Sequence, residues 1–315
     1  MRKPWMVGVL AGLLLLGACG DPSSGPESAP PPVPSAPKAS STTHQRPAAT
    51  PEAGADTGAG TEAEAPSPSV RPTVLYLGDS LAMENQKVLG GLMRDELKAR
   101  YTSAPYSGTT LCDYLEGTGK DSLVPPKDKA AALVRTLRPD FVVLQFWGNA
   151  WGYTPCMDGI TYDKARDKYF ARYTADARRL TDQIAGAAGG DRPKVVWVLQ
   201  GPDPMTPDRV RRVNAVYERQ AAASGDLLAD AGKAVSPASA RYTWSQYLPC
   251  TAYEREHTAY CTQPGSGRTA LHIDDDYLHF CLVPTTTTPR PCPVRSPGIL
   301  RITRAITGAV AAQLG

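Results

Sequence analysis

The sequence predicts an α/β domain with a mostly parallel sheet of about five strands, covered by helices on both faces. Short apolar runs such as 74–77 and 195–199 lack the alternation of apolar and polar residues that marks a half-buried strand. Segments with helical periodicity separate these runs, as expected where successive strands run parallel. The 315 residues are sufficient for one domain with a sizeable core.

The expected elements follow one another from residue 73. The strands are expected at 73–77, 101–106, 140–146, 194–199 and 226–229. The helices are expected from about 82 to 97, then at 129–137, 163–184, 206–223 and 299–314. Glycines at 189 and 190 end the third helix, and Pro207 marks the first turn of the fourth. Ligands of such sheets bind beyond the carboxyl ends of the strands, so the segments after the first three strands form the expected site.

A serine directly follows the first expected strand, within the Gly-Asp-Ser-Leu sequence of residues 78–81. A serine at a tight strand-to-helix turn exposes its hydroxyl at the edge of the sheet, which is the mechanical requirement for a nucleophile. Ser80 is therefore the candidate nucleophile. For this segment taken alone, the alternative is a turn that merely starts a helix.

The candidate base lies near the C-terminus, where Asp276 precedes His279 by three residues. In an acyl-transfer site, His279 would remove the proton of Ser80 and return it to the leaving oxygen. Asp276 would fix the tautomer of the imidazole and stabilise its charged form.

Two other histidines and two other carboxylates are alternatives. His272 has no acid three residues before it, and His257 lies in a charged stretch that is expected to be exposed. Asp274 and Asp275 are less well spaced from a histidine, and we expect them to be solvated.

Donors for a developing oxyanion are expected after the first three strands. They are the backbone amides of Ser80 and Gly108 and the side-chain amide of Asn149. One such donor is worth about 3 kcal/mol in known cases. The alternatives are a simple turn residue for Asn149 and a tight backbone turn at Gly108.

These residues resemble the four sequence blocks of the SGNH (GDSL) hydrolase superfamily. The blocks carry a Ser, a Gly, an Asn and a His, and they match Ser80, Gly108, Asn149 and His279 in the family's order. The match spans most of residues 73–280, although Gly148 directly precedes the asparagine where the family usually has Gly-x-Asn. The resemblance implies a three-layer α/β/α, flavodoxin-like fold and ester or acyl-transfer chemistry, generally without a metal.

Aromatic residues cluster around the candidate oxyanion donor. Trp147 and Trp151, with Phe146 and Tyr153 nearby, are candidates to line an acyl pocket or to stack on a sugar ring. Core packing is the alternative for Phe146 and Trp147.

No cofactor, metal or nucleic acid is expected. Residues 117–120 lack the first glycine of a phosphate loop, and the next residue is not the required Ser or Thr. No dinucleotide fingerprint or zinc-protease motif is present. The formal charge of +3 falls to +1 (3 − 2 = 1) without Arg2 and Lys3, which gives no electrostatic case for nucleic acid.

The first 18 residues predict a lipoprotein signal peptide. Basic residues precede an apolar core too short to span a bilayer, which ends in Leu-Gly-Ala before Cys19. This order resembles a bacterial lipobox and implies lipidation of Cys19; a plain signal peptide is the alternative. Residues 19–71 contain no aromatic side chain and predict a disordered tether rich in Pro, Ala and Ser, followed by the domain at 72–315. We therefore expect a monomer anchored to the outer face of the cell membrane.

Six cysteines remain in the domain, an even number that in an exported protein predicts three disulfides. They are Cys112, Cys156, Cys250, Cys261, Cys281 and Cys292. Six cysteines allow 15 pairings. Proximity in the sequence favours 250–261 and 281–292, which leaves 112–156. Zinc is disfavoured because the spacings include no C-x-x-C pair.

Together these features predict an ester hydrolase that forms an acyl intermediate on Ser80 and acts on O-acyl or lipid esters at the cell envelope. An O-acyltransferase that modifies envelope polysaccharide would share the same machinery. A non-catalytic glycan-binding module is the third hypothesis.

Overall fold

The computed structural model describes residues 71–118, 122–150, 154–285 and 290–315. The predicted signal peptide, Cys19 and nearly all of the tether lie outside the described residues. Among the described helices, none combines the length and the apolar character that crossing a membrane requires.

A five-stranded parallel sheet forms the centre of the domain. Its strands are β1 (Thr73–Gly78), β2 (Arg100–Ser103), β3 (Phe141–Gln145), β4 (Lys194–Val198) and β5 (Leu227–Ala229). Their spatial order is β2-β1-β3-β4-β5, and every neighbouring pair is parallel. The prediction of a mostly parallel sheet of about five strands is confirmed.

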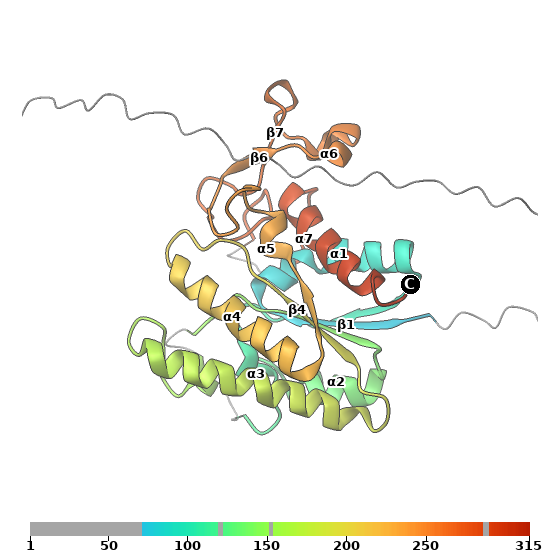
Figure 1. The fold of residues 1–315 in the computed structure, drawn as a ribbon, viewed down its shortest axis with the longest axis vertical. Helices are drawn as coiled ribbons and strands as arrows, with labels where there is room; N and C mark the ends of the chain where they lie inside the picture. The colour runs from blue at the N-terminus through green and yellow to red at the C-terminus, as the bar shows by residue number, and fades with distance from the viewer. Residues whose placement is uncertain (1–70, 119–121, 151–153, 286–289) are drawn as a thin grey trace, which may run out of the picture. The chain divides into compact units, whose positions relative to one another are not determined.

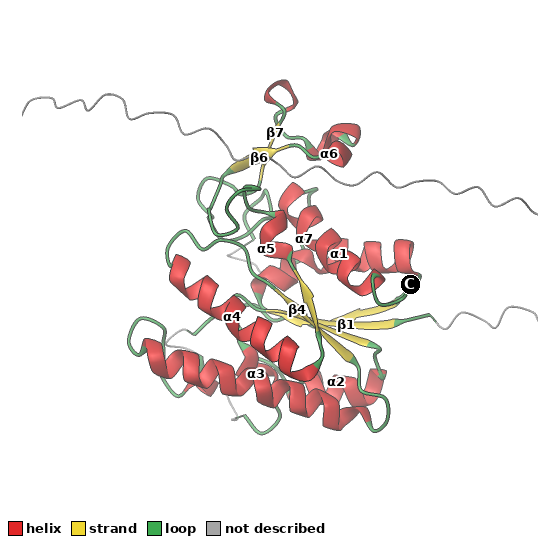
Figure 2. Cartoon of the chain, in the orientation of Figure 1, coloured by secondary structure: helices red, strands yellow, loops and turns green. Residues whose placement is uncertain are grey.

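Helices cover both faces of the sheet, which makes a three-layer α/β/α domain (Figures 1 and 2). On one face lie α1 (Ser80–Leu97), α5 (Ala231–Ala234) and α7 (Pro297–Ala311). On the other lie α2 (Ala130–Leu137), α3 (Arg166–Ala188) and α4 (Pro207–Ser224). Side chains of β1 alternate between the two cores: Val74 and Tyr76 face α1 and α7, whereas Leu75 and Leu77 face α2, α3 and α4.

A small antiparallel hairpin was not predicted from the sequence. It pairs β6 (Tyr247–Pro249) with β7 (Arg268–Ala270), and α6 (Ala252–Glu256) lies in the connection. The buried carboxylate of Glu254 in α6 forms an ion pair of 2.6 Å with Arg301 of α7. This ion pair fastens the hairpin to the α1, α5 and α7 layer, on the far side from the sheet (Figure 1).

Short 3₁₀ turns complete the described part of the chain. They are η1 (Leu111–Tyr114), η2 (Pro126–Asp128), η3 (Pro155–Met157), η4 (Thr258–Tyr260) and η5 (Pro264–Ser266). Two of them, η1 and η3, follow β2 and β3 and lie in the loops where the sequence placed the oxyanion donors.

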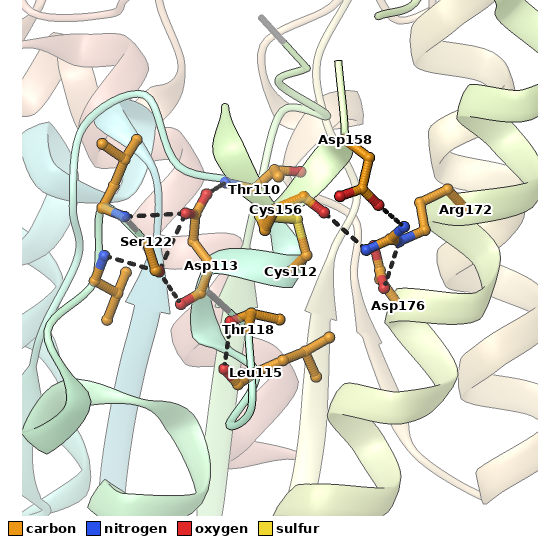
Figure 3. The surroundings of a disulfide bond; sticks show 12 residues. Thr110, Cys112, Asp113, Leu115, Thr118, Ser122, Cys156, Asp158, Arg172 and Asp176 are labelled. Atoms are coloured by element: carbon orange, nitrogen blue, oxygen red, sulfur yellow. Dashed lines mark hydrogen bonds and ion pairs between the residues drawn. A yellow bond between two sulfur atoms is a disulfide. The ribbon is translucent and has the colours of Figure 1, made fainter. Parts of the chain in front are cut away.

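The described residues contain three disulfides: the 250–261 and 281–292 pairs that sequence proximity favoured, and the remaining pair 112–156. The Cys112–Cys156 bridge joins η1 to η3 and therefore links the loops after β2 and β3 (Figure 3). Arg172 of α3 supports this bridge, because it donates 2.7 Å to the carbonyl of Cys156 and forms ion pairs with Asp158 and Asp176. The disulfide thus links the loops after β2 and β3, and Arg172 fastens the loop after β3 to α3.

The strand-to-helix turn at Gly78 leaves no room for a side chain. A Cβ at this position would lie 2.1 Å from the carbonyl oxygen of Gln145 and 2.5 Å from the Cβ of Ala82. Only glycine therefore lets β1 run this close to β3 and turn at once into α1.

We expect Gly78→Ala to destabilise the domain by at least the roughly 1–3 kcal/mol that overpacking costs in a core. Urea unfolding followed by circular dichroism measures this loss. Gly91→Ala in α1 is the matched control, because a Cβ at Gly91 meets nothing within 4 Å. It should stabilise the domain by up to about 1 kcal/mol. Equal unfolding midpoints for the two variants would contradict the close approach.

Candidate active site

Ser80 is the first residue of α1 and lies at the carboxyl end of β1, partly exposed to solvent. The residue before it, Asp79, caps the helix by accepting a 3.0 Å hydrogen bond from the amide of Leu81. The turn from strand to helix thus presents the Ser80 hydroxyl at the edge of the sheet.

His279 and Asp276 lie next to this serine, although 199 positions separate Ser80 from His279. The Nε2 atom of His279 is 3.0 Å from Ser80 Oγ, and its Nδ1 is 2.9 Å from Asp276 Oδ2. A carboxylate can only accept, so Nδ1 carries the proton and donates it. The unprotonated Nε2 then faces the serine hydroxyl as an acceptor, which is the arrangement of a general base beside a nucleophile.

The three-residue spacing of Asp276 and His279 has a local explanation. Asp276 Oδ1 accepts hydrogen bonds from the backbone amides of Leu278 (3.1 Å) and His279 (3.0 Å). The carboxylate therefore turns the backbone around itself and receives the imidazole from the same turn. Burial opposes the charge of Asp276, but hydrogen bonds from the side chain and backbone of His279 outweigh it and hold the pKa of Asp276 below its ordinary value.

The charge of His279 is favoured by its surroundings. Burial opposes the protonated imidazole, but the hydrogen bond to Asp276 and the negative charges of Glu84, Asp276 and Asp79 together raise its pKa above the ordinary value of 6.5. An imidazole with a raised pKa is a stronger acceptor for the proton of Ser80.

Asp79 is a fully buried carboxylate that ties the loop after β3 to the serine turn. Its Oδ2 accepts 2.7 Å from the amide of Trp147 and 3.1 Å from the side-chain amide of Asn149. Burial raises the pKa of Asp79 to about 6, although the hydrogen bonds from the amides of Trp147 and Leu81 lower it. In the sequence Asp79 is only part of the serine motif, and nothing there indicates its hydrogen bonds to the loop after β3.

The loops after β2 and β3 bring the predicted oxyanion donors to the serine turn. The chain beyond β2 continues alongside β1, where the backbone amide of Tyr106 donates a 2.9 Å hydrogen bond to the carbonyl of Gly78. Gly108 follows with a φ of 75°, and Gly148 turns the loop after β3 with a φ of 90°. Both values lie in the left-handed region that favours glycine.

The predicted oxyanion donors differ in the hydrogen bonds that they already make. The amide of Ser80 is at the first position of a helix, where N–H groups have no partner within the helix. The side-chain amide of Asn149 donates both to Asp79 (3.1 Å) and to the carbonyl of Thr109 (3.1 Å). Asn149 thus joins the two loops, and its role as an oxyanion donor stays a prediction that requires one of these bonds to be exchanged.

The alternative histidines and carboxylates lie elsewhere or play other parts. His257 is exposed and stacks on Tyr253 with ring centroids 3.8 Å apart. His272 is buried, and its Nδ1 donates 2.8 Å to the carbonyl of His279, so it supports the backbone of the candidate base. Asp274 and Asp275 are exposed, as expected for solvated groups.

Trp147 lines a small pocket together with Leu81, next to Ser80, and Leu278, next to His279, so the role of Trp147 in a substrate pocket stays a prediction. Its side chain is 3% exposed, and the guanidinium of Arg209 lies over the ring at 3.6 Å from the centroid. Arg209 in turn pairs with buried Asp203 at 3.0 Å. The ring is therefore packed inside the protein. Trp151 and Tyr153, the neighbouring candidates, lie outside the described residues.

One acidic residue of the site was missed from the sequence. Glu84 is 1% exposed and lies one helical turn after Ser80 in α1. Its carboxylate accepts hydrogen bonds from the backbone amides of Phe280 (2.9 Å) and Cys281 (3.1 Å), directly after His279. The signal available was an acid on the apolar face of the helix, between Leu81 and Val88.

No group of histidines, cysteines and acids in the described ranges is arranged to hold a metal ion. The candidate site consists of a serine, a histidine and carboxylates, and what it offers chemically is proton transfer and nucleophilic attack.

Comparison with known proteins gives matches at the level of structure. No family model matches the chain, and no curated protein matches it. Solved structures that it resembles include an acetylxylan esterase from Geobacillus stearothermophilus (15% identity, 76% of this chain and 94% of the other, TM-score 0.43). A carbohydrate esterase family 3 protein from Talaromyces cellulolyticus matches at 14% identity over 77% and 98% of the two chains, with a TM-score of 0.46.

A third match is the C-terminal catalytic domain of peptidoglycan O-acetyltransferase A from Streptococcus pneumoniae. It shares 13% identity over 78% of this chain and 95% of that one, with a TM-score of 0.39. Other solved structures that the chain resembles include an esterase from Pseudoalteromonas and a lipase from a goat rumen metagenome. At these identities and TM-scores the matches carry no argument about chemistry, for which the geometry of Ser80, His279 and Asp276 is the basis.

The pH dependence of any turnover tests the pairing of His279 with Asp276. His279 must be neutral to accept a proton, so kcat/KM should fall as the pH drops through its raised pKa, above 6.5. Asp276→Asn should move this acid limb to lower pH and reduce kcat by about 10³–10⁴-fold, since it removes the charge and the tautomer control. The exposed neighbour gives the control Asp275→Asn, which should leave both unchanged. An acid limb that stays in place in Asp276→Asn would refute the pairing.

Proposed function

We propose that this chain is a serine-dependent hydrolase of carboxylic esters, working through an acyl intermediate on Ser80. The observation that carries the proposal is the chain of hydrogen bonds from Ser80 through His279 to Asp276. These three groups come from two distant segments and meet at the carboxyl edge of a parallel sheet, where ligands of such folds bind. The SGNH (GDSL) resemblance of the sequence blocks supports the same chemistry.

The geometry assigns each group a step. His279 Nε2 takes the proton of Ser80 as Oγ attacks the ester carbonyl, and the resulting imidazolium returns it to the leaving oxygen. Water activated by the same imidazole then releases the acid. The amides of Ser80 and Gly108 are the proposed donors to the oxyanion, and the partial positive charge at the start of α1 favours the same negative oxygen.

We further propose an exported, lipid-anchored protein that acts on O-acyl or lipid esters of the cell envelope. The signal-like first 18 residues and Cys19 support export and anchoring. Three disulfides also support it, because such bridges persist in oxidising compartments. The tether of residues 19–71 would let the domain reach substrates within a wall layer.

Ser80→Ala should abolish hydrolysis of chromogenic acyl esters by the full chain, with at least a 10³-fold loss of kcat, because no other group replaces the attacking oxygen. Short and medium acyl chains are compared to give the chain-length preference. Ser266→Ala, at an exposed serine of η5, is the matched control and should keep full activity. Undiminished turnover in Ser80→Ala would refute the acyl intermediate.

Acceptor dependence separates hydrolysis from transfer. The same measurement is repeated with added polysaccharide, and the released acid and the acylated glycan are both quantified. We expect acid release without glycan to be the faster process. Acyl transfer to glycan above the rate of hydrolysis would instead identify an O-acyltransferase, and glycan binding without any turnover would identify a binding module.

A further inference from the structure

The carboxylate of Glu84 connects the two segments that supply the candidate triad. Glu84 belongs to α1, the helix that begins with Ser80, and its two oxygens accept the amides of Phe280 (2.9 Å) and Cys281 (3.1 Å). These amides belong to the two residues that follow His279. One side chain therefore fixes the backbone of the base relative to the helix of the nucleophile.

The connection is reinforced by backbone and covalent bonds around the same point. The carbonyl of Glu84 accepts 3.1 Å from the amide of Cys292, and Cys292 is bonded to Cys281. The loop from 281 to 292 is thus fastened to Glu84 at both of its ends, through the side chain at one and the main chain at the other.

In the described part of the chain, the Glu84 carboxylate is buried without a lysine or arginine partner, so its charge interacts with that of His279. The carboxylate is 1% exposed, and among the ion pairs of the described residues none joins it to a lysine or an arginine. Burial raises the pKa of Glu84 to about 7, while the positive form of His279 lowers it. The protonated imidazole of His279 is therefore the cation that favours the charged form of the buried Glu84 carboxylate.

We propose that Glu84 is a positioning residue of the active site, which holds His279 at hydrogen-bonding distance from Ser80 and supplies a second negative charge to its imidazolium. The inference rests on the proposed serine-hydrolase function. It goes beyond the triad because it assigns the alignment of the base to a helix residue whose carboxylate binds backbone amides and not the serine hydroxyl or the imidazole.

Several charged or titratable groups face His279, and the test must separate Glu84 from them. Asp276 lies in the same turn and binds Nδ1. Asp79 at the cap of α1 also favours the charged imidazole. His272, from the segment after β7, donates to the carbonyl of His279, and burial lowers its pKa. Removing Glu84 alone leaves these groups in place.

Glu84→Gln removes the charge and keeps the size of the side chain. Its amide NH₂ cannot accept, so one of the two backbone amides loses its partner. We expect kcat to fall by about 10²-fold, the cost of a small misplacement of a catalytic group, with little change in KM. The pKa of His279 should fall because a nearby negative charge is lost.

Glu84→Asp separates position from charge. It keeps the carboxylate but shortens its reach by one methylene, so kcat should fall while the pKa of His279 stays closer to that of the wild type. Glu96→Gln, at an exposed acid of the same helix, is the matched control and should change neither quantity. A merely structural role would lower the stability of both Glu84 variants without moving the pKa of His279.

The experiment is an NMR titration of the histidine ring protons of the full chain in detergent, beside ester kinetics for the same proteins. The His279 signal is assigned by its loss in His279→Gln. A lowered His279 pKa in Glu84→Gln, with the loss of kcat, supports the proposal. An unchanged pKa overturns it, and so does a kcat within twofold of the wild type.

The outcomes also separate this inference from the proposed function. If the wild type hydrolyses no ester, the proposed function fails, whereas the NMR titration still decides whether Glu84 acts on His279. If Glu84→Gln does not fold, the comparison of Glu84→Asp with the wild type decides. There, an unchanged kcat would overturn the positioning role.

Discussion

The 3.0 Å contact between Ser80 Oγ and His279 Nε2 is the interaction on which the site depends, and it joins segments 199 positions apart. Ser80 is fixed by the start of α1, and α1 is fixed by the close approach of Gly78 to Gln145. His279 lies after β7, and the described residues 271–285 around it form no helix or strand. The imidazole can therefore stay in place only if other contacts position that segment.

Two buried carboxylates of the serine turn and α1 hold the irregular segments of the site, and each binds backbone amides of a segment far away in the sequence. Asp79 binds the amide of Trp147 in the loop after β3, and Glu84 binds the amides that follow His279. A hydrogen bond from an N–H group to a charged acceptor is about twice as strong as one between neutral groups. Apolar packing adds to these bonds, because Trp147 and Phe280 of the two segments are buried in the core.

Features set by local chemistry could be predicted from the sequence. Buried strands and the serine after β1 follow from short runs of residues, and the Asp276–His279 pair follows from a turn in which one carboxylate binds the backbone and the ring. The disulfide pairing followed from proximity for the two short loops, and elimination left the long one. Apart from the long disulfide, each of these patterns needs only neighbours in the chain.

Features set by packing between distant segments could not be predicted. The cover of Trp147 by Arg209 depends on how α4 meets the loop after β3. The hairpin of β6 and β7 has strands of three residues each, too short for a periodic pattern. Glu84 appeared only as an acid on an apolar helix face, and its meaning required the amides of Phe280 and Cys281, which lie nearly 200 positions further along the chain.

The carboxylates also shape the electrostatics of the proton transfer. Asp276, Glu84 and Asp79 all favour the charged form of His279. The charged imidazole in turn lowers the pKa values of Glu84 and Asp79, which burial has raised to about 7 and about 6. Above pH 7, where these carboxyl groups are ionised, the proton that leaves Ser80 therefore enters a field of negative charges that are already in place. In water, the same stabilisation would require solvent to reorganise as the charge forms. The burial that is unfavourable for the resting carboxylates thus becomes an advantage when the imidazolium appears.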